Sequence, residues 1–480
     1  MGELTDLAGE QLSAGIAARR FSCRELMSAT LARIARLNPV HNAIVSLRDP
    51  DALLREADER DAELARGARR GWLHGIPQAI KDAMSVAGIR STMGSPLLAD
   101  NVPSQDDLLV QRTKAAGAIV IGRTNSPEFG LGSHTFNEVH GLTRNAYDPS
   151  RAAGGSSGGA AVALATRMLA VADGSDFMGS LRNPAGWNNV YGFRPSQGRV
   201  PNWPLVDAYV AQLSTCGPMA RNVLDLARLL DVQAGYDPRV PLSLDGEVRA
   251  ADAVLASTPG DAHVRIGWLA DLDGYLAMED GVLDVCEAAL RRFEGLGAVV
   301  ERASATFDAA GAWAAWLAWR RWLVAGRIAP FLGKPGNRAK LKPEALWEVE
   351  QAEGLTGNDT MRASVARTQF HTQILRLFER HDVLALPTAQ VWPFDASLRW
   401  PASVAGRTMD TYHRWMEVTI YATFAGLPCI AMPAGFGPGG LPMGLQLIGR
   451  PRADAALLRI AAAFERGSGD VLGVRPREPD

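Results

Sequence analysis

Two adjacent serines framed by four glycines, at residues 154–159, constrain the fold of this chain more than any other segment. Glycine has no Cβ, so such a segment can adopt unusual backbone conformations and let other groups approach closely. A flexible linker is disfavoured because an apolar, alanine-rich run typical of a helix begins directly at Ala160. A nucleotide-binding loop is disfavoured because the segment has neither a Gly-Lys-Ser/Thr ending nor a G-x-G-x-x-G pattern. The segment therefore predicts an ordered turn that carries two hydroxyl groups.

The composition is that of an ordinary globular protein. The 480 residues are 47% hydrophobic and 21% charged, and the formal net charge of -2 gives no global attraction to nucleic acid or to an anionic membrane. Four cysteines lie far apart in the chain, which fits a reducing compartment. The most apolar stretches, residues 160–172 and 309–325, are interrupted by arginines, so neither gives the roughly 18 apolar residues of a membrane span. We expect a soluble, cytoplasmic protein without a secretory signal, membrane span or nucleic-acid partner.

Helical patterns alternate with short apolar runs along the chain. Residues 22–37 begin with a capping box of Ser22 and Glu25, and Asn38-Pro39 is expected to end this helix. A second helix is expected over residues 108–116, capped by Ser104. Strands are expected at residues 118–121, 264–268, 383–386 and 445–448. This alternation predicts an α/β core that is covered on both faces.

Two further segments carry chemistry. Residues 75–82 form an apolar run that ends in Lys81, and lysine acts as a base only where burial or a neighbouring cation keeps it neutral. Taken alone, a surface lysine at a strand end is the more common interpretation. Residues 174–184 place Ser180 directly after Gly179, and amide groups in such a turn can stabilise an oxyanion. Taken alone, this segment is equally compatible with a structural turn.

Together, the three segments resemble the amidase-signature family closely. The match runs from a Gly-Ile-Pro strand ending in Lys-Asp, through Gly-Gly-Ser-Ser-Gly-Gly, to a Gly-Ser-Asp loop ending in Gly-Ser-Leu-Arg-Asn-Pro. Residues 122–129, 144–151, 425–428 and 441–449 are also similar to family motifs, and the two serines have the family's spacing. Residues 240–380 are the poorly matched part.

The resemblance implies an α/β fold with a mixed central β-sheet flanked by helices, formed by residues 1–480 as one domain. We expect a helical N-terminal segment at residues 1–45 and a signature core at about 65–235. A variable insert at about 300–380 is expected to serve the substrate, and a closing core is expected at 381–470.

The resemblance also implies a Ser-Ser-Lys catalytic set. Ser180 would attack the amide carbonyl, and Ser156, after a cis peptide bond from Gly155, would relay the proton to neutral Lys81. The backbone N–H groups of Phe177, Met178, Gly179 and Ser180 would hold the oxyanion. The chain departs from the family pattern in having Ser175 for threonine and Met178 for glycine. We interpret Met178 as a change in pocket shape that preserves activity.

A stripe of tryptophans is the most unusual feature of the insert. Trp313, Trp316, Trp319 and Trp322 recur every three residues, a spacing that keeps them near one face of a helix. A stripe facing the core is the commoner interpretation, and an aromatic wall for the substrate is the functional one. Trp187, Trp316 and Trp319 are the candidate substrate-binding residues, with Phe177 and Trp203 as further candidates. A basic run of Lys334, Arg338, Lys340 and Lys342 is by default a solvated loop, with capture of an acidic group as the lesser option.

These observations predict hydrolysis of a carboxamide with a hydrophobic or aromatic part, to the acid and ammonia or an amine, with esters or carbamates as further substrates. Neither cofactor nor metal is expected, because the eight histidines are scattered and no H-E-x-x-H pattern occurs. The first alternative is the glutamine-hydrolysing component of a tRNA-dependent amidotransferase, which needs protein partners. The second is a catalytically silent binding protein on the same fold. The expected partner is a small-molecule amide, and the sequence leaves a homodimer open.

Overall fold

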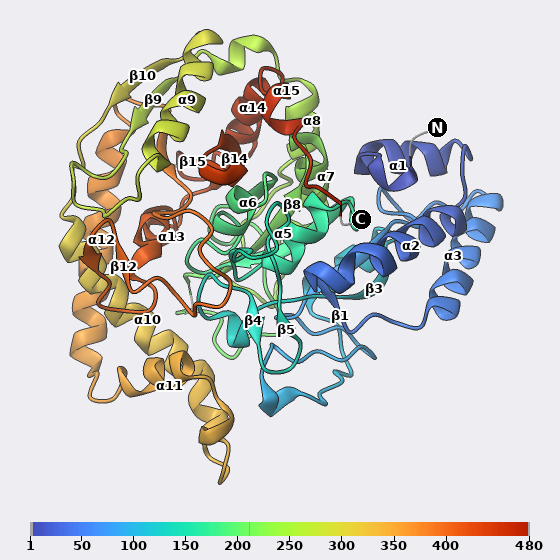
Figure 1. The fold of residues 1–480 in the computed structure, drawn as a ribbon, viewed down its shortest axis with the longest axis horizontal. Coiled ribbons are helices and arrows are strands. Elements are labelled where there is room, and N and C mark those ends of the chain that lie inside the picture. Colours follow the sequence, from blue (N-terminus) through green and yellow to red (C-terminus); the bar gives the residue numbers. More distant parts are fainter. Residues whose placement is uncertain (1–2, 211, 479–480) are drawn as a thin grey trace.

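A mixed sheet of eight strands organises the molecule, and the computed structural model describes residues 3–210 and 212–478 (Figure 1). In sheet order the strands are β10 (Val299–Arg302), β9 (Arg265–Trp268), β11 (Val383–Pro387), β15 (Pro442–Gly449), β14 (Cys429–Phe436), β7 (Tyr191–Arg194), β8 (Thr215–Ala220) and β6 (Val171–Asp176). The first three pair in parallel and the rest are antiparallel. The predicted mixed α/β sheet is confirmed.

A smaller sheet lies beside the β6 edge of the large one. It has the order β1 (Ile44–Val45), β3 (Ile119–Thr124), β2 (Pro77–Lys81). The backbone N–H of Lys81 donates to the Asp173 carboxylate on β6 over 3.1 Å, so a side chain joins the two sheets where no backbone ladder runs. Two further pairs are β4 (Phe136–Asn137) with β5 (Gly141–Leu142), and β12 (Ser403–Val404) with β13 (Arg407–Thr408).

Helices surround these sheets. The N-terminal helices α1–α3 lie at one end of the molecule and α10–α12 at the other (Figure 1). The helices are α1 (Gly9–Ala17), α2 (Cys23–His41), α3 (Pro50–Ala65), α4 (Leu108–Ala115), α5 (Gly158–Ala165), α6 (Asn183–Trp187), α7 (Val223–Gln233), α8 (Ala250–Leu255), α9 (Val282–Gly295), α10 (Ala309–Leu332), α11 (Pro343–Glu350), α12 (Gly357–Leu377), α13 (Ile420–Ala425), α14 (Asp454–Glu465) and α15 (Gly469–Leu472). Every residue of α5 is buried, which fits its position directly behind the glycine-framed serines.

The N-terminus of α2 is as predicted, but its C-terminus is not. Ser22 caps α2, and Glu25 completes the capping box. The helix continues through Pro39 to His41, because proline removes only its own N–H while the amide of Asn42 still bonds to the carbonyl of Asn38 over 2.7 Å. Asn42 then adopts the left-handed conformation that ends the helix.

The predicted cap of α4 is wrong. Asp107 occupies the N-cap position that was expected at Ser104, and its carboxylate accepts the amide of Ser85 instead of one from its own helix. The expected strands at residues 118–121, 264–268, 383–386 and 445–448 correspond to β3, β9, β11 and β15. Within the described residues, the structure contains no helix with the length and apolarity needed to cross a bilayer.

Candidate active site

Lys81, the last residue of β2, has a completely buried side chain surrounded by hydroxyl groups. Its Nζ lies 2.8 Å from Ser156 Oγ, 2.9 Å from Ser157 Oγ and 3.0 Å from Ser175 Oγ. The three serines come from the glycine-framed turn and from β6, which the chain places against the end of β2. Ser175, which replaces the threonine of the family pattern, thus retains the hydroxyl that contacts the amine.

The amine of Lys81 has an altered acidity. Burial lowers the pKa of Lys81 to about 7, against the opposing influence of the Asp173 and Asp176 carboxylates. An amine with this pKa is substantially neutral near physiological pH, whereas an ordinary lysine is almost entirely charged. Lys81 can therefore accept a proton from a neighbouring hydroxyl.

Ser156 is held at a crowded turn. The Gly155–Ser156 peptide bond is cis, as the resemblance implied. Gly130 approaches from another loop, and a Cβ at this position would lie 3.5 Å from Ser156 Oγ. Because Gly130 also has a φ of +71°, the loop beside Ser156 favours glycine for both conformation and space.

The loop that carries Ser180 is tied down by one buried carboxylate. Asp176 accepts the amides of Gly179 over 2.9 Å and Leu181 over 3.2 Å, and two hydrogen bonds from the Arg182 guanidinium. Arg194 contacts the same carboxylate over 3.3 Å, and all three charged side chains are fully buried. Burial alone would raise the pKa of Asp176, but Arg182 and Arg194 hold it well below the usual range of a carboxyl group.

These bonds change the expected set of oxyanion donors. The amide of Gly179, one of the predicted donors, is already bonded to Asp176. The amides of Phe177, Met178 and Ser180 have no acceptor among the residues that the structure describes. An oxyanion can therefore receive hydrogen bonds from these three amides, whereas Gly179 serves to shape the turn, with a φ of +84°.

The structure brings Lys81 and Ser156 into direct contact but does not bond Ser156 to Ser180. The Ser180 hydroxyl makes no hydrogen bond to any described residue, and the side chain is 6% exposed. The hydroxyl predicted to attack the substrate is thus unengaged, while the hydroxyl predicted to relay the proton is bonded to the amine.

Met178 and Phe177 face α10. Met178 is buried and its φ lies outside the left-handed region, so this position does not need the family's glycine. Nη1 of Arg320 lies 3.9 Å from the Met178 sulfur. The Phe177 ring centroid lies 5.6 Å from that of Trp316, which places one candidate substrate residue beside the Ser180 loop.

The other tryptophans pack away from this loop. Trp187 is fully buried and stacks on Trp415 with ring centroids 5.8 Å apart. Trp319 contacts Trp322 and lies under the Arg367 guanidinium, and Trp313 packs against His413. A substrate role of Trp187 and Trp319 stays a prediction.

The basic run of the insert divides into two environments. Arg338 forms a surface ion pair with Glu350. Lys342 is buried, and its Nζ donates to the carbonyl of Leu131 over 2.6 Å. Burial lowers the pKa of Lys342 to about 8. Lys342 thus does not belong to the solvated loop that the run predicts by default.

Several residues around the site were not expected from the sequence. Ser157 stands beside Ser156 in the glycine-framed doublet, so the doublet itself was a usable signal. Asp173 and Arg194 gave none, because a single charged residue beside a strand pattern predicts a surface position more often than a buried contact. Their roles arise from pairings between segments that only the folded chain brings together.

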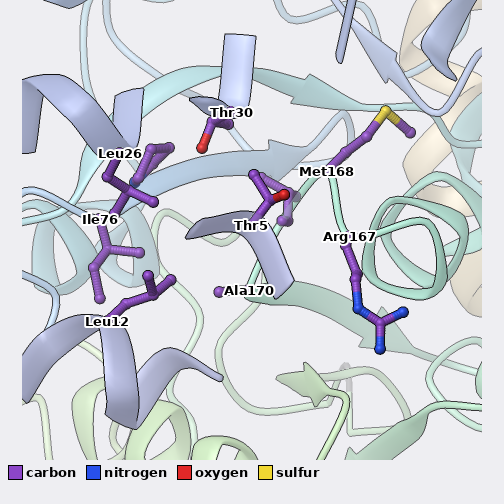
Figure 2. A pocket seen from close by; sticks show the side chains of 10 residues that line it. Thr5, Leu12, Leu26, Thr30, Ile76, Arg167, Met168 and Ala170 are labelled. Carbon is purple, nitrogen blue, oxygen red and sulfur yellow. The ribbon is translucent and has the colours of Figure 1, made fainter. Parts of the chain in front are cut away.

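A cavity at the opposite end of β2 is too small for a substrate. Figure 2 shows it beneath the N-terminal helices, lined by Thr5, Leu12, Leu26, Ile76 and Arg167, among others. Its volume of about 10 Å³ has room for roughly one water molecule. In the part of the chain that the structure describes, no three His, Cys, Asp or Glu side chains come together as metal ligands would.

Known proteins resemble this chain over nearly its whole length. The family model described as Amidase matches residues 25–458. The chain is 35% identical to the glutamine-hydrolysing component (GatA) of the glutamyl-tRNA(Gln) amidotransferase of Thermosynechococcus vestitus, over 95% of this chain and 97% of that protein. It is 33% identical to an acylamidase of Rhodococcus erythropolis, over 96% and 95%. A bacterial aryl acylamidase of the amidase-signature family superposes with a TM-score of 0.90 at 28% identity, covering 98% and 99% of the two chains.

We predict that Asp176→Asn destabilises the protein strongly. The variant keeps the shape of the side chain but leaves Arg182 and Arg194 buried without their counter-charge, a loss of about 3–5 kcal/mol in other buried ion pairs. Thermal unfolding measures this, with Asp58→Asn as the matched control because Asp58 pairs with Arg24 at the surface. Equal melting temperatures for the two variants would show that the buried carboxylate does not hold the loop.

Proposed function

The chain belongs to the amidase family, and on that premise we propose that it hydrolyses a carboxamide through an acyl-enzyme on Ser180. The observation that carries this proposal is the buried amine of Lys81, 2.8 Å from the Ser156 hydroxyl and with its pKa lowered by burial to about 7. A base with that pKa is suited to proton transfer near neutral pH.

The proposed reaction begins with attack of Ser180 Oγ on the amide carbonyl carbon. Ser156 takes the proton of Ser180 and gives its own proton to neutral Lys81. The negative charge on the carbonyl oxygen is stabilised by backbone amides, for which those of Phe177, Met178 and Ser180 are available.

Collapse of this intermediate breaks the C–N bond. The relay returns the proton to the leaving nitrogen, because an amine anion is a very poor leaving group. Water then attacks the acyl group on Ser180 with the same relay as base, which releases the acid and restores the enzyme.

We propose a substrate with a hydrophobic or aromatic part. Phe177 belongs to the Ser180 loop and its ring contacts Trp316, so an acyl or amine substituent next to the reacting carbonyl would meet aromatic surface. The acylamidase and aryl acylamidase among the relatives act on amides in keeping with this class.

Two finer statements are part of the proposal. The division into N-terminal, signature, insert and closing segments follows the sequence motifs, with α10–α12 forming most of the insert. The cytoplasmic location and a homodimeric state are retained from the sequence.

We predict that Ser180 alone is labelled by a fluorophosphonate. Wild-type protein should gain one phosphonyl group on the peptide that contains Ser180, detected by mass spectrometry. Ser180→Ala should lose the label, because no other hydroxyl is both activated and unengaged. Ser196→Ala is the control, since the Ser196 hydroxyl is buried without a partner and distant in sequence from the site. Labelling of Ser180→Ala at the wild-type rate would exclude Ser180 as nucleophile and support a silent protein.

We predict that kcat/KM for a neutral amide rises with pH and levels off, with a midpoint near pH 7. Below the pKa of about 7, Lys81 carries a proton and cannot accept another, and above it the amine is free to act as base. Steady-state kinetics from about pH 5 to 9 measure the profile. Lys81→Ala should retain the fold and lose nearly all turnover. A flat profile, or normal turnover in Lys81→Ala, would contradict the assignment of the base.

The second candidate function is glutamine hydrolysis, favoured by the 35% identity to an amidotransferase component. We expect the purified chain, without partner proteins, to hydrolyse an anilide or another hydrophobic amide faster than glutamine. A panel from acetamide through anilides to fatty amides, with product identification, measures this preference. Ammonia release from glutamine as the fastest reaction would favour the amidotransferase role instead.

A further inference from the structure

Helix α10 passes over both halves of the candidate active site. Near its middle, the Arg320 guanidinium lies 5.4 Å from the Phe177 ring centroid, on the loop that carries Ser180. Near its end, Phe331 contacts Phe129 with ring centroids 5.5 Å apart. Phe129 precedes Gly130, the residue that lies against Ser156. The helix therefore spans from the Ser180 loop to the Ser156 turn.

Arg327 lies on the same face of α10 as these contact residues. An α-helix has 3.6 residues per turn, so positions seven apart are nearly aligned and positions four apart are close neighbours on one face. Arg327 follows Arg320 by seven residues and precedes Phe331 by four. Between the two contacts to the site, α10 thus directs Arg327 toward the site.

The two arginines differ in their partners. Arg320 is buried, and its guanidinium lies 2.7 Å from both the Glu348 carboxylate and the Tyr412 hydroxyl. Its charge is therefore balanced. Arg327 forms no ion pair and no hydrogen bond with any residue that the structure describes.

The surroundings of Arg327 are those of a recess. Its side chain is exposed, yet burial and the charge of Arg320 lower the pKa of the Arg327 guanidinium. A group on a convex surface would be open to water without such desolvation, so the two properties together place Arg327 on the wall of a concave space. After burial and the nearby carboxylates, the charge of Arg327 also contributes to lowering the pKa of Lys81. The recess therefore opens onto the candidate site.

We propose that Arg327 binds a carboxylate of the substrate, so that the preferred amides carry a carboxylate a few bonds from the carbonyl that is cleaved. A guanidinium offers two parallel N–H donors that match a carboxylate, and pairing is strongest where water is excluded. This inference rests on the proposed amidase function and specifies its substrate class. The carboxylate can belong to the acyl part or to the amine part of the amide.

Matched substrate pairs test the proposal. Succinamate carries the carboxylate on the acyl part, and N-acetyl-β-alanine carries it on the amine part. Each is compared with the neutral methyl ketone of the same length, in which a methyl group replaces one carboxylate oxygen. We expect wild-type enzyme to have a higher kcat/KM for at least one anionic amide than for its neutral counterpart. The pair that shows the preference identifies which part of the substrate carries the carboxylate.

Variants of Arg327 then assign the preference to this residue. In Arg327→Met, the ratio of kcat/KM between the anionic and the neutral amide should fall by about 10- to 100-fold, the loss typical of a charge-assisted hydrogen bond. Arg327→Lys should recover part of the ratio. The control is Arg376→Met, which removes an exposed arginine from the neighbouring helix α12 and should keep the wild-type ratio.

The outcomes separate this inference from the proposed function. The inference is overturned if wild-type enzyme has no anionic preference, if Arg327→Met keeps it, or if an enzyme labelled at Ser180 cleaves neither anionic amide. Absence of both fluorophosphonate labelling and amide hydrolysis would instead overturn the proposed function.

Discussion

The site depends on the removal of one amine from water. Lys81 is fully buried at the end of β2, and its Nζ meets the hydroxyls of Ser156, Ser157 and Ser175. A neutral amine has two N–H groups and one lone pair, so two hydroxyls can accept from it while the third donates to it. An ammonium in this position would lose its hydration in exchange for neutral partners only. The environment therefore favours the form of Lys81 that can act as a base.

The nearby carboxylates are arranged so that they do not reverse this preference. Asp176 is balanced by Arg182 and Arg194 and spends its oxygens on the Ser180 loop. Asp173 accepts the backbone amide of Lys81, and burial raises the pKa of its own carboxyl group, which weakens its negative charge. The same two residues hold the fold together here, since Asp173 joins the sheets and Asp176 shapes the turn after β6.

The sequence predicted those features that lie within one segment. The capping box of α2, the apolar strands and the glycine-framed turn are local patterns of residue type, and they appear in the structure as expected. The ends of elements were less predictable, because Asn42 rather than Pro39 ends α2 and Asp107 is used by a neighbouring loop. Ser175 as a partner of Lys81, and Arg194 as a partner of Asp176, could not be predicted, since each contact joins separate strands. The occupied amide of Gly179 is likewise set by a tertiary contact that spacing does not reveal.

A direct titration of Lys81 tests the central claim. In enzyme labelled with ¹³C at the lysine ε carbon, the resonance lost in Lys81→Met identifies this residue, and Lys342→Met identifies the second buried lysine. The account predicts a Lys81 midpoint near pH 7, below that of Lys342 near pH 8. A Lys81 midpoint near pH 10, the value of a lysine in water, would show that the amine is charged at neutral pH and cannot be the base.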